Sequence, residues 1–214
     1  MIEGKARIAK GRREGIFAHW PNRITAVRFV GSLGLFVILS LAVDSQLAGP
    51  AGVVQACFWL FLLIAGTDFL DGHLARKYGH VTAFGRIADP FVDKVMVIGL
   101  MVFLAVFEWS REWFPAWVVV VVVAREFLVT GIRGYIESLG LQFPADWFGK
   151  IKMVVQCVAI GIVLGLFSFE WPSALRGPLE VLGHAFVWGT VLTTVGSGGS
   201  YVLKTRRILA DGSD

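Results

Sequence analysis

Four aspartates carry the most chemical information in this chain of 214 residues. They form two pairs, Asp68 with Asp71 and Asp89 with Asp93, and each pair lies in a mostly apolar stretch. Residues three or four apart share one face of a helix, so each pair presents two carboxylates together. Ionisable groups beside apolar spans are costly and usually have a function. Because oxygen ligands suit Mg²⁺ or Mn²⁺, which also bind phosphate, the spacing predicts a divalent-cation site for phosphate chemistry.

The composition indicates that membrane helices position these aspartates. Apolar residues make up 56% of the chain and charged residues 17%, and the mean hydropathy is +0.68. A soluble domain carries about a quarter charged residues. About 20 apolar residues are enough for one helical span. The sequence therefore predicts an all-α, polytopic integral membrane protein with about six transmembrane helices, near residues 24–43, 51–75, 84–107, 114–136, 148–168 and 178–203.

The segments between these spans suggest one domain with two short extensions. We expect a basic N-terminal segment at 1–20, a six-helix domain at 21–205 and a tail at 206–214. The N-terminal segment is either a short interfacial helix or a solvated basic tail. Thr82 is a plausible N-cap for the third span. Turns are predicted at 44–50, 77–80, 108–115, 140–144 and 170–178.

Lysine and arginine residues set the expected orientation. They gather before the first span, in the second and fourth connections and in the tail, whereas the other connections offer only Arg111 and Arg176. The positive-inside rule then places both termini and the aspartates on the cytoplasmic side of the cell (inner) membrane. The net charge of +4 fits this orientation and does not call for nucleic acid.

The short connection between the second and third spans predicts that they are antiparallel neighbours, so that the two aspartate rows meet. Four carboxylates this close repel each other unless cations neutralise them. Gly72 and Gly85 lie on or beside the same rows, where a missing side chain lets a ligand approach the backbone. Helix packing is the alternative for both glycines. Arg76 either meets a phosphate or snorkels to the membrane surface.

The segment that contains the aspartates resembles a known signature. The pattern Asp68-x2-Asp71-Gly72-x2-Ala75-Arg76-x8-Gly85-x3-Asp89-x3-Asp93 is similar to that of the CDP-alcohol phosphatidyltransferase family. The resemblance implies metal-dependent displacement of CMP from a CDP-linked lipid by an alcohol. It implies that the four aspartates bind two metal ions and that Asp93 is also the base. It further implies that the CDP site is lined by Gly72, Ala75, Arg76 and Gly85.

Three further segments are similar to the phosphatidylglycerophosphate synthases within that family: 21–28, 124–133 and 149–152. The first contains Asn22 and Thr25, which the resemblance assigns to CDP-lipid binding. Met153 departs from the threonine that is common in this subfamily. The resemblance implies CDP-diacylglycerol and glycerol 3-phosphate as substrates, in contact with the lipid bilayer. A homodimer is a further expectation.

A phosphorylated acceptor needs cations near the metal site. Arg125 and Arg133 are eight residues apart, two turns along nearly one helix face, and Lys150 begins the next span with Lys152 after it. We expect Arg125, Arg133 and Lys150 to bind the acceptor phosphate near the cytoplasmic ends of two helices. Ordinary positive-inside charge is the alternative. Arg28 is expected to pair with an acid or a phosphate, and the sequence leaves both open.

Two other functions fit part of this pattern. The same chemistry can use another acceptor, such as inositol phosphate or serine, and a divalent-cation transporter can use the same aspartates. A transporter needs polar residues that continue across the membrane, whereas the third span is almost wholly apolar after Lys94. The run 196–200, rich in glycine and serine, lacks the lysine and the preceding strand of a phosphate loop, and close helix packing is expected there.

Overall fold

The computed structural model describes residues 20–44, 51–78, 83–141 and 147–211. This part of the chain contains helices and turns and no strand, so the predicted all-α class is confirmed. The predictions for Thr82 and for an interfacial helix in residues 1–19 concern residues outside these ranges. The helices are α1 (Trp20–Asp44), α2 (Ala51–Tyr78), α3 (Ala83–Val106), α4 (Ala116–Ser138), α5 (Trp147–Ser168) and α6 (Ser173–Asp211).

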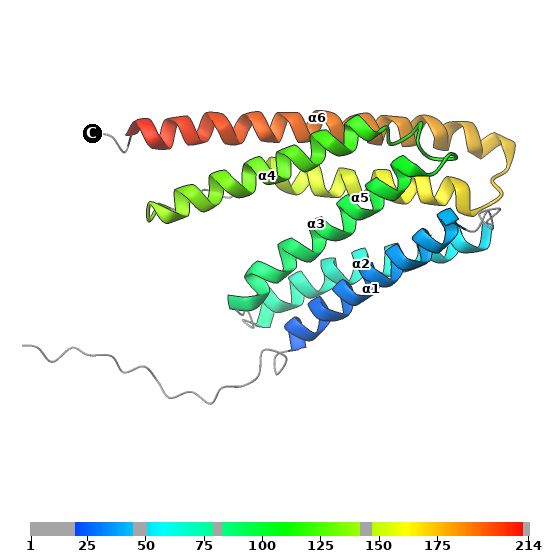
Figure 1. Cartoon of the computed structure of the whole chain (residues 1–214), viewed down its shortest axis with the longest axis horizontal. Helices are drawn as coiled ribbons and strands as arrows, with labels where there is room; N and C mark the ends of the chain where they lie inside the picture. The colour runs from blue at the N-terminus through cyan, green and yellow to red at the C-terminus, as the bar shows by residue number, and fades with distance from the viewer. Residues whose placement is uncertain (1–19, 45–50, 79–82, 142–146, 212–214) are drawn as a thin grey trace, which may run out of the picture.

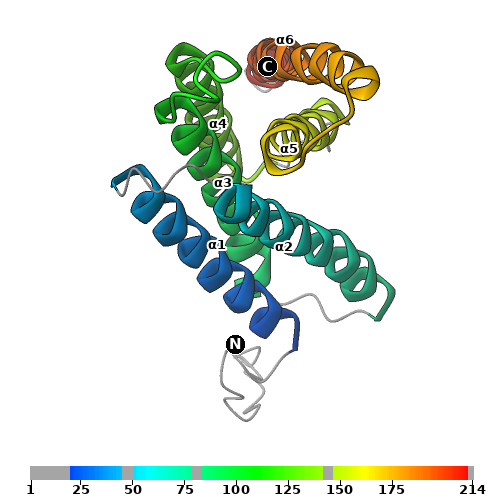
Figure 2. The ribbon, with the colours of Figure 1, turned by 90° about the vertical axis from the view of Figure 1, so that its right-hand side faces the viewer.

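The helices run back and forth along one long direction (Figure 1). The starts of α1, α3 and α5 and the ends of α2, α4 and α6 all lie toward the left of that view. Helix α1 packs against α2 and α3, while α6 packs against α4 and α5. Contacts of α2 with α5 and of α3 with α4 join these two groups, whose separation is seen end-on in Figure 2. The bundle thus brings alternate helix ends to one side, as the charge distribution predicts.

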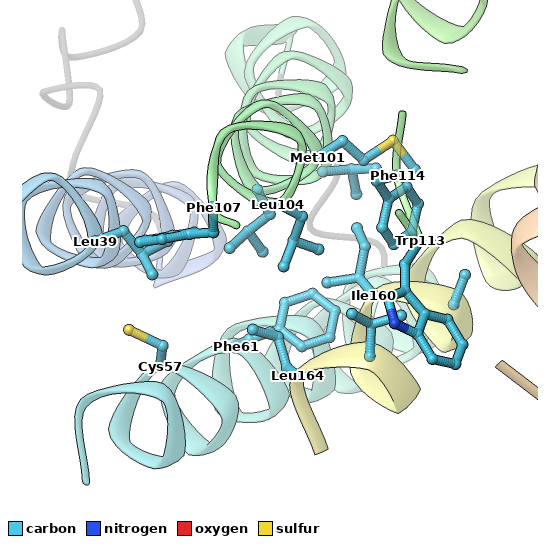
Figure 3. Packing of buried hydrophobic residues seen from close by; sticks show 14 of the residues in the cluster. Leu39, Cys57, Phe61, Met101, Leu104, Phe107, Trp113, Phe114, Ile160 and Leu164 are labelled. Atoms are coloured by element: carbon cyan, nitrogen blue, oxygen red, sulfur yellow. The ribbon is translucent and has the colours of Figure 1, made fainter. Parts of the chain in front are cut away.

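A continuous apolar core holds the bundle together (Figure 3). Helix α2 contributes Phe61 and α5 contributes Leu164, both almost completely buried. Phe114, in the connection between α3 and α4, is also fully buried, so this predicted turn folds into the core. Packing of this kind stabilises the arrangement inside a membrane, where helix association depends on close van der Waals contact.

Helix α6 begins earlier than the sequence suggested. The turn predicted over residues 170–178 is wrong from residue 173 onward, because the helix starts at Ser173. The carbonyl of Pro172 accepts hydrogen bonds from the backbone N–H groups of Leu175 and Arg176, at 2.8 and 3.0 Å. Pro178 is the sixth residue of the helix and has no N–H group, so the carbonyl one turn before it receives no helical bond from this position.

The end of α4 confirms the turn predicted at residue 140. Gly140 has φ = 75°, a left-handed conformation that glycine adopts without strain. Its N–H donates to the carbonyl of Glu137 at 3.0 Å, and the N–H of Leu141 donates to that of Ile136 at 3.2 Å. These are the two bonds of a Schellman motif, which stops the helix and satisfies its last carbonyl groups.

Within the described residues, three helices are long and apolar enough to cross a membrane: α1 over Asn22–Leu41, α5 over Trp147–Ser168 and α6 over Ser173–Ile208. Helix α2 has a shorter apolar stretch, Gly52–Thr67. The apolar sequences of α3 and α4 contain charged residues, which belong to the site described below. The protein is an integral membrane protein, and the count of six spans stays a prediction.

Close packing of α3 on α1 gives a test of the fold. A Cβ atom on Gly99 would lie 2.1 Å from Cζ of Phe36, and Phe36 is itself stacked on Phe103. Gly99→Ala is therefore expected to lower the free energy of unfolding by about 1–3 kcal/mol through overpacking. Thermal unfolding in detergent measures the effect. Gly34→Ala is the matched control, since nothing lies within 4 Å of a Cβ there, and equal stability of the two variants would contradict the packing.

Candidate active site

The two aspartates of α3 are held by residues of α1. The hydroxyl of Thr25 donates to Oδ1 of Asp89 at 2.5 Å, and the guanidinium of Arg28 forms an ion pair with Oδ1 of Asp93. Thr25 and Arg28 are buried, 5% and 4% exposed. Of the acid and the phosphate that the sequence left open for Arg28, the structure shows an acid, Asp93, as a partner. Two side chains one turn apart on α1 thus contact two aspartates one turn apart on α3.

The same face of α1 carries a third predicted site residue. Asn22, Thr25 and Arg28 follow each other at intervals of three residues, so they lie on one side of the helix. Asn22 is 1% exposed, and Gly85, at the start of α3, is also buried. The predicted CDP-lipid residues Asn22, Thr25 and Gly85 are thus all buried, and Thr25 contacts α3 through Asp89.

The other predicted CDP-lipid and metal residues lie in the last part of α2. Their backbone is helical, and their side chains lie outside the described part of the structure; they are Asp68, Asp71, Gly72, Ala75 and Arg76. Helix α1 packs against both α2 and α3, so it links the two aspartate-bearing helices. The predicted contact between the aspartate row of α2 and that of α3 stays a prediction.

The described half of the aspartate array fits a hard divalent cation. Asp89 and Asp93 present carboxylates one turn apart, and both are half-buried. Oxygen donors of this kind are the ones that Mg²⁺ and Mn²⁺ prefer. Within the described residues no three His, Cys, Asp or Glu side chains gather. A complete ligand set therefore needs the carboxylates of α2 in addition.

A second polar cluster surrounds Glu126 of α4. Oε1 of Glu126 forms ion pairs with Nη1 of Arg125 at 3.0 Å and with Nζ of Lys152 from α5. Its Oε2 lies 3.5 Å from Nζ of Lys94 from α3. Arg125, Glu126 and Lys152 are all less than 9% exposed. Three cations from three helices thus surround one carboxylate, and the cluster carries an excess of two positive charges.

Helix α6 completes the surroundings of the two predicted arginines. Nε of Arg125 donates to Oγ of Ser197 at 2.9 Å, and Nη2 of Arg133 donates to the hydroxyl of Tyr201 at 2.7 Å. Both guanidinium groups lie near the ring of Tyr201, 5.5 Å and 6.0 Å from its centroid. The expectation that Arg125 and Arg133 share a face of α4 is therefore confirmed.

The lysines of α5 are placed differently from the expectation. Lys150 is exposed, and its Nζ lies 5.6 Å from the ring centroid of Trp147 on its own helix. Lys152, two residues later, is the one that enters the cluster around Glu126. Arg125 lies near the middle of α4, farther from the end of the helix than Arg133. The two lysines differ because a helix rotates by about 100° per residue, so residues close in sequence face different partners.

The two clusters are adjacent through α3. Asp93 contacts Arg28 of α1, and the next residue, Lys94, contacts Glu126 and the hydroxyl of Thr130 on α4. Sequence reasoning missed the roles of Lys94 and Glu126. The available signal was the acid itself, because an ionisable residue inside an apolar segment marks a functional site.

Comparison with known proteins agrees with this arrangement. The CDP-alcohol phosphatidyltransferase family profile matches residues 18–196. The CDP-diacylglycerol–glycerol-3-phosphate 3-phosphatidyltransferase of Bacillus subtilis (strain 168) is 33% identical over 196 residues, which cover 86% of this chain and 93% of that protein. The same-named protein of Rickettsia felis is 29% identical over 181 residues, covering 85% of this chain and 92% of its own.

A probable phosphatidylglycerophosphate synthase of Mycobacterium tuberculosis (strain H37Rv) is 36% identical over 208 residues, covering 97% of this chain and 87% of that protein. The family profile and these relatives cover the helices that carry both clusters. The α1–α3 aspartate site and the signature on α2 and α3 lie inside the match. This integral membrane protein therefore belongs to the CDP-alcohol phosphatidyltransferase family and is an enzyme of that family.

Proposed function

We propose that the protein transfers the phosphatidyl group of CDP-diacylglycerol to glycerol 3-phosphate, giving phosphatidylglycerophosphate and CMP. The observation that carries the proposal is the cationic cluster around Glu126, which adjoins Asp93 through Lys94. The activity named for the three relatives supports the same acceptor.

The charge of the cluster favours a phosphorylated acceptor, such as glycerol 3-phosphate or inositol phosphate, over serine. Buried charges are costly unless they are paired, and the buried Arg125 and Lys152 share the one carboxylate of Glu126, which favours the binding of a further anion beside them. A phosphate monoester carries about −1.5 to −2 charges at pH 7 and accepts several hydrogen bonds. Glycerol 3-phosphate meets both needs with one phosphate group. Serine carries no net charge and leaves the cations uncompensated.

The reaction proceeds between the two clusters on the cytoplasmic side of the inner membrane. Asp68, Asp71, Asp89 and Asp93 would hold two Mg²⁺ or Mn²⁺ ions, which would supply charge neutralisation for the diphosphate and the departing CMP. Asp93 accepts the proton of the primary hydroxyl of glycerol 3-phosphate. The hydroxyl oxygen bonds to the phosphorus that carries diacylglycerol, and the bond from that phosphorus to CMP breaks.

The remaining residues hold the substrates and the acids in place. Thr25 and Arg28 orient Asp89 and Asp93. Arg125 and Arg133 bind the acceptor phosphate, with Lys152 in the position first expected of Lys150. The CDP group lies against Asn22, Thr25, Gly72, Ala75, Arg76 and Gly85.

The acceptor is tested by CMP release from labelled CDP-diacylglycerol. Purified protein is given glycerol 3-phosphate, glycerol, serine or inositol phosphate, with Mg²⁺ or Mn²⁺ present. We expect glycerol 3-phosphate to support the fastest release. Faster release with serine or inositol phosphate would contradict the proposed acceptor and leave the family membership intact. The transporter alternative is not favoured, because the buried side chains of α3 after Lys94 are apolar.

The metal requirement is tested on the same assay. A chelator is expected to abolish CMP release, and Asp89→Asn is expected to lower metal affinity or turnover at least ~10-fold through the loss of an anionic ligand. Varying the Mg²⁺ and Mn²⁺ concentrations measures the affinity. Glu180→Gln is the matched control, because Glu180 is paired with Arg176 near the start of α6. That start lies at the opposite end of the bundle from the starts of α1 and α3 (Figure 1). Full activity in chelator, or in Asp89→Asn, contradicts the metal site.

A further inference from the structure

Two residues of α6 contact the arginines assigned above to the acceptor phosphate. Ser197 and Tyr201 are one turn apart and are 0% and 3% exposed. They accept hydrogen bonds from Arg125 and Arg133 respectively. Both residues lie after residue 196, where the match to the family profile ends. The sequence suggested only close helix packing for this part of the chain.

The contacts fix the direction of each guanidinium group. Ser197 binds Nε of Arg125 and Glu126 binds its Nη1, so two partners on different helices define the plane of the fork. Gly198 allows close packing, since a Cβ there would lie 3.4 Å from Cγ of Arg125. An arginine fork binds phosphate in two-point geometry, which requires this plane to be set.

The two partners of the arginines on α6, Ser197 and Tyr201, are uncharged, so they leave the positive charge of the arginines available to bind an anion. A second carboxylate near the arginines would cancel the charge that attracts a phosphate. A hydroxyl accepts a hydrogen bond without removing that charge, and the face of an aromatic ring attracts a cation weakly. Tyr201 provides both, with its hydroxyl on Arg133 and its ring near both guanidinium groups.

We infer that Ser197 and Tyr201 are positioning residues of the acceptor site, which hold Arg125 and Arg133 in the orientation that binds the phosphate of the acceptor. The inference rests on the proposed function and adds α6 to the site. It also gives the glycine- and serine-rich segment of α6 a role beyond packing. These residues act through the arginines, so their effect should appear in acceptor binding.

Removing one hydroxyl tests the inference with little change in volume or charge. Tyr201→Phe is expected to raise the KM for glycerol 3-phosphate about 3- to 10-fold, the size of one net hydrogen bond. The KM for CDP-diacylglycerol and kcat should stay within about twofold. Tyr201 acts only on a residue that binds the acceptor, and it does not take part in the reaction itself. Tyr135→Phe, on the exposed part of α4, is the matched control. A KM does not depend on the fraction of folded enzyme, so loss of stability alone leaves the KM values of both substrates unchanged.

A double-mutant cycle shows whether Tyr201 acts through Arg133. Tyr201→Phe is repeated in an Arg133→Ala background, where it should have no further effect on the KM for glycerol 3-phosphate. Ser197→Ala should likewise lose its effect in an Arg125→Ala background, and Ser197→Thr, which keeps the hydroxyl, should retain a KM near that of the wild type. Where a background lacks turnover, calorimetric titration with glycerol 3-phosphate replaces the KM.

Three results overturn the inference: an unchanged KM for glycerol 3-phosphate in Tyr201→Phe, an equal rise for both substrates, or additive effects in the cycles. The acceptor panel on the wild-type enzyme tests the proposed function separately. If the wild-type enzyme uses glycerol 3-phosphate but the double-mutant cycles are additive, only the role of α6 is refuted. A wild type that prefers serine refutes the proposed acceptor.

Discussion

Asp93→Asn is expected to lower turnover roughly 10²- to 10⁴-fold, the usual effect of losing a general base. Asparagine has nearly the same shape as aspartate and its amide oxygen can still accept a hydrogen bond from Arg28, so the α1–α3 contact is kept. It cannot accept the proton of the acceptor hydroxyl. Steady-state CMP release at saturating substrates measures the change.

Measuring CDP-diacylglycerol binding distinguishes the role of Asp93 as a base from a structural role. Asp93→Asn should still bind CDP-diacylglycerol, measured by titration in detergent, because three other aspartates remain. Glu137→Gln, an exposed acid on α4, is the control and should have normal turnover. Unchanged turnover in Asp93→Asn removes this residue from proton transfer. Loss of lipid binding together with turnover assigns it to metal or substrate binding instead.

Arg125→Ala is expected to raise the KM for glycerol 3-phosphate roughly 10- to 150-fold. A hydrogen bond to a charged group contributes about 1.5–3 kcal/mol, and each 1.4 kcal/mol is a factor of ten in affinity. The KM for CDP-diacylglycerol should move little, since the aspartate site lies between α1 and α3 on the other side of Lys94. Initial rates with each substrate varied in turn give both constants.

The matched control for Arg125 is Arg176→Ala. Arg176 is an exposed arginine that pairs with Glu180 within α6, at the start of that helix. It should leave both constants unchanged. If Arg125→Ala weakens both substrates equally, Arg125 serves the structure of the bundle, and the phosphate must be bound by other cations.

The sequence by itself determined most of the helices of this protein and the spacing of its aspartates along them. Helix α5 was expected at 148–168 and lies at Trp147–Ser168, because apolar length and turn residues are local properties. The one-turn spacing of Asp89 and Asp93 likewise follows from helix geometry alone. The start of α6 was missed, since two prolines in that region offered two possible turns and only backbone bonding to Pro172 chose between them.

Only the tertiary structure decided which residues meet across helices. Arg28 finds Asp93 65 residues away, and Arg125 finds Ser197 across 72 residues. Lys152 enters the cluster around Glu126, whereas Lys150 faces outward, although both lysines looked alike in the sequence. Local patterns show which face of a helix a residue occupies but not which helix packs against that face. That pairing depends on how side chains of different helices fit together, and it is the packing of α6 on α4 that brings Ser197 and Tyr201 to the two arginines.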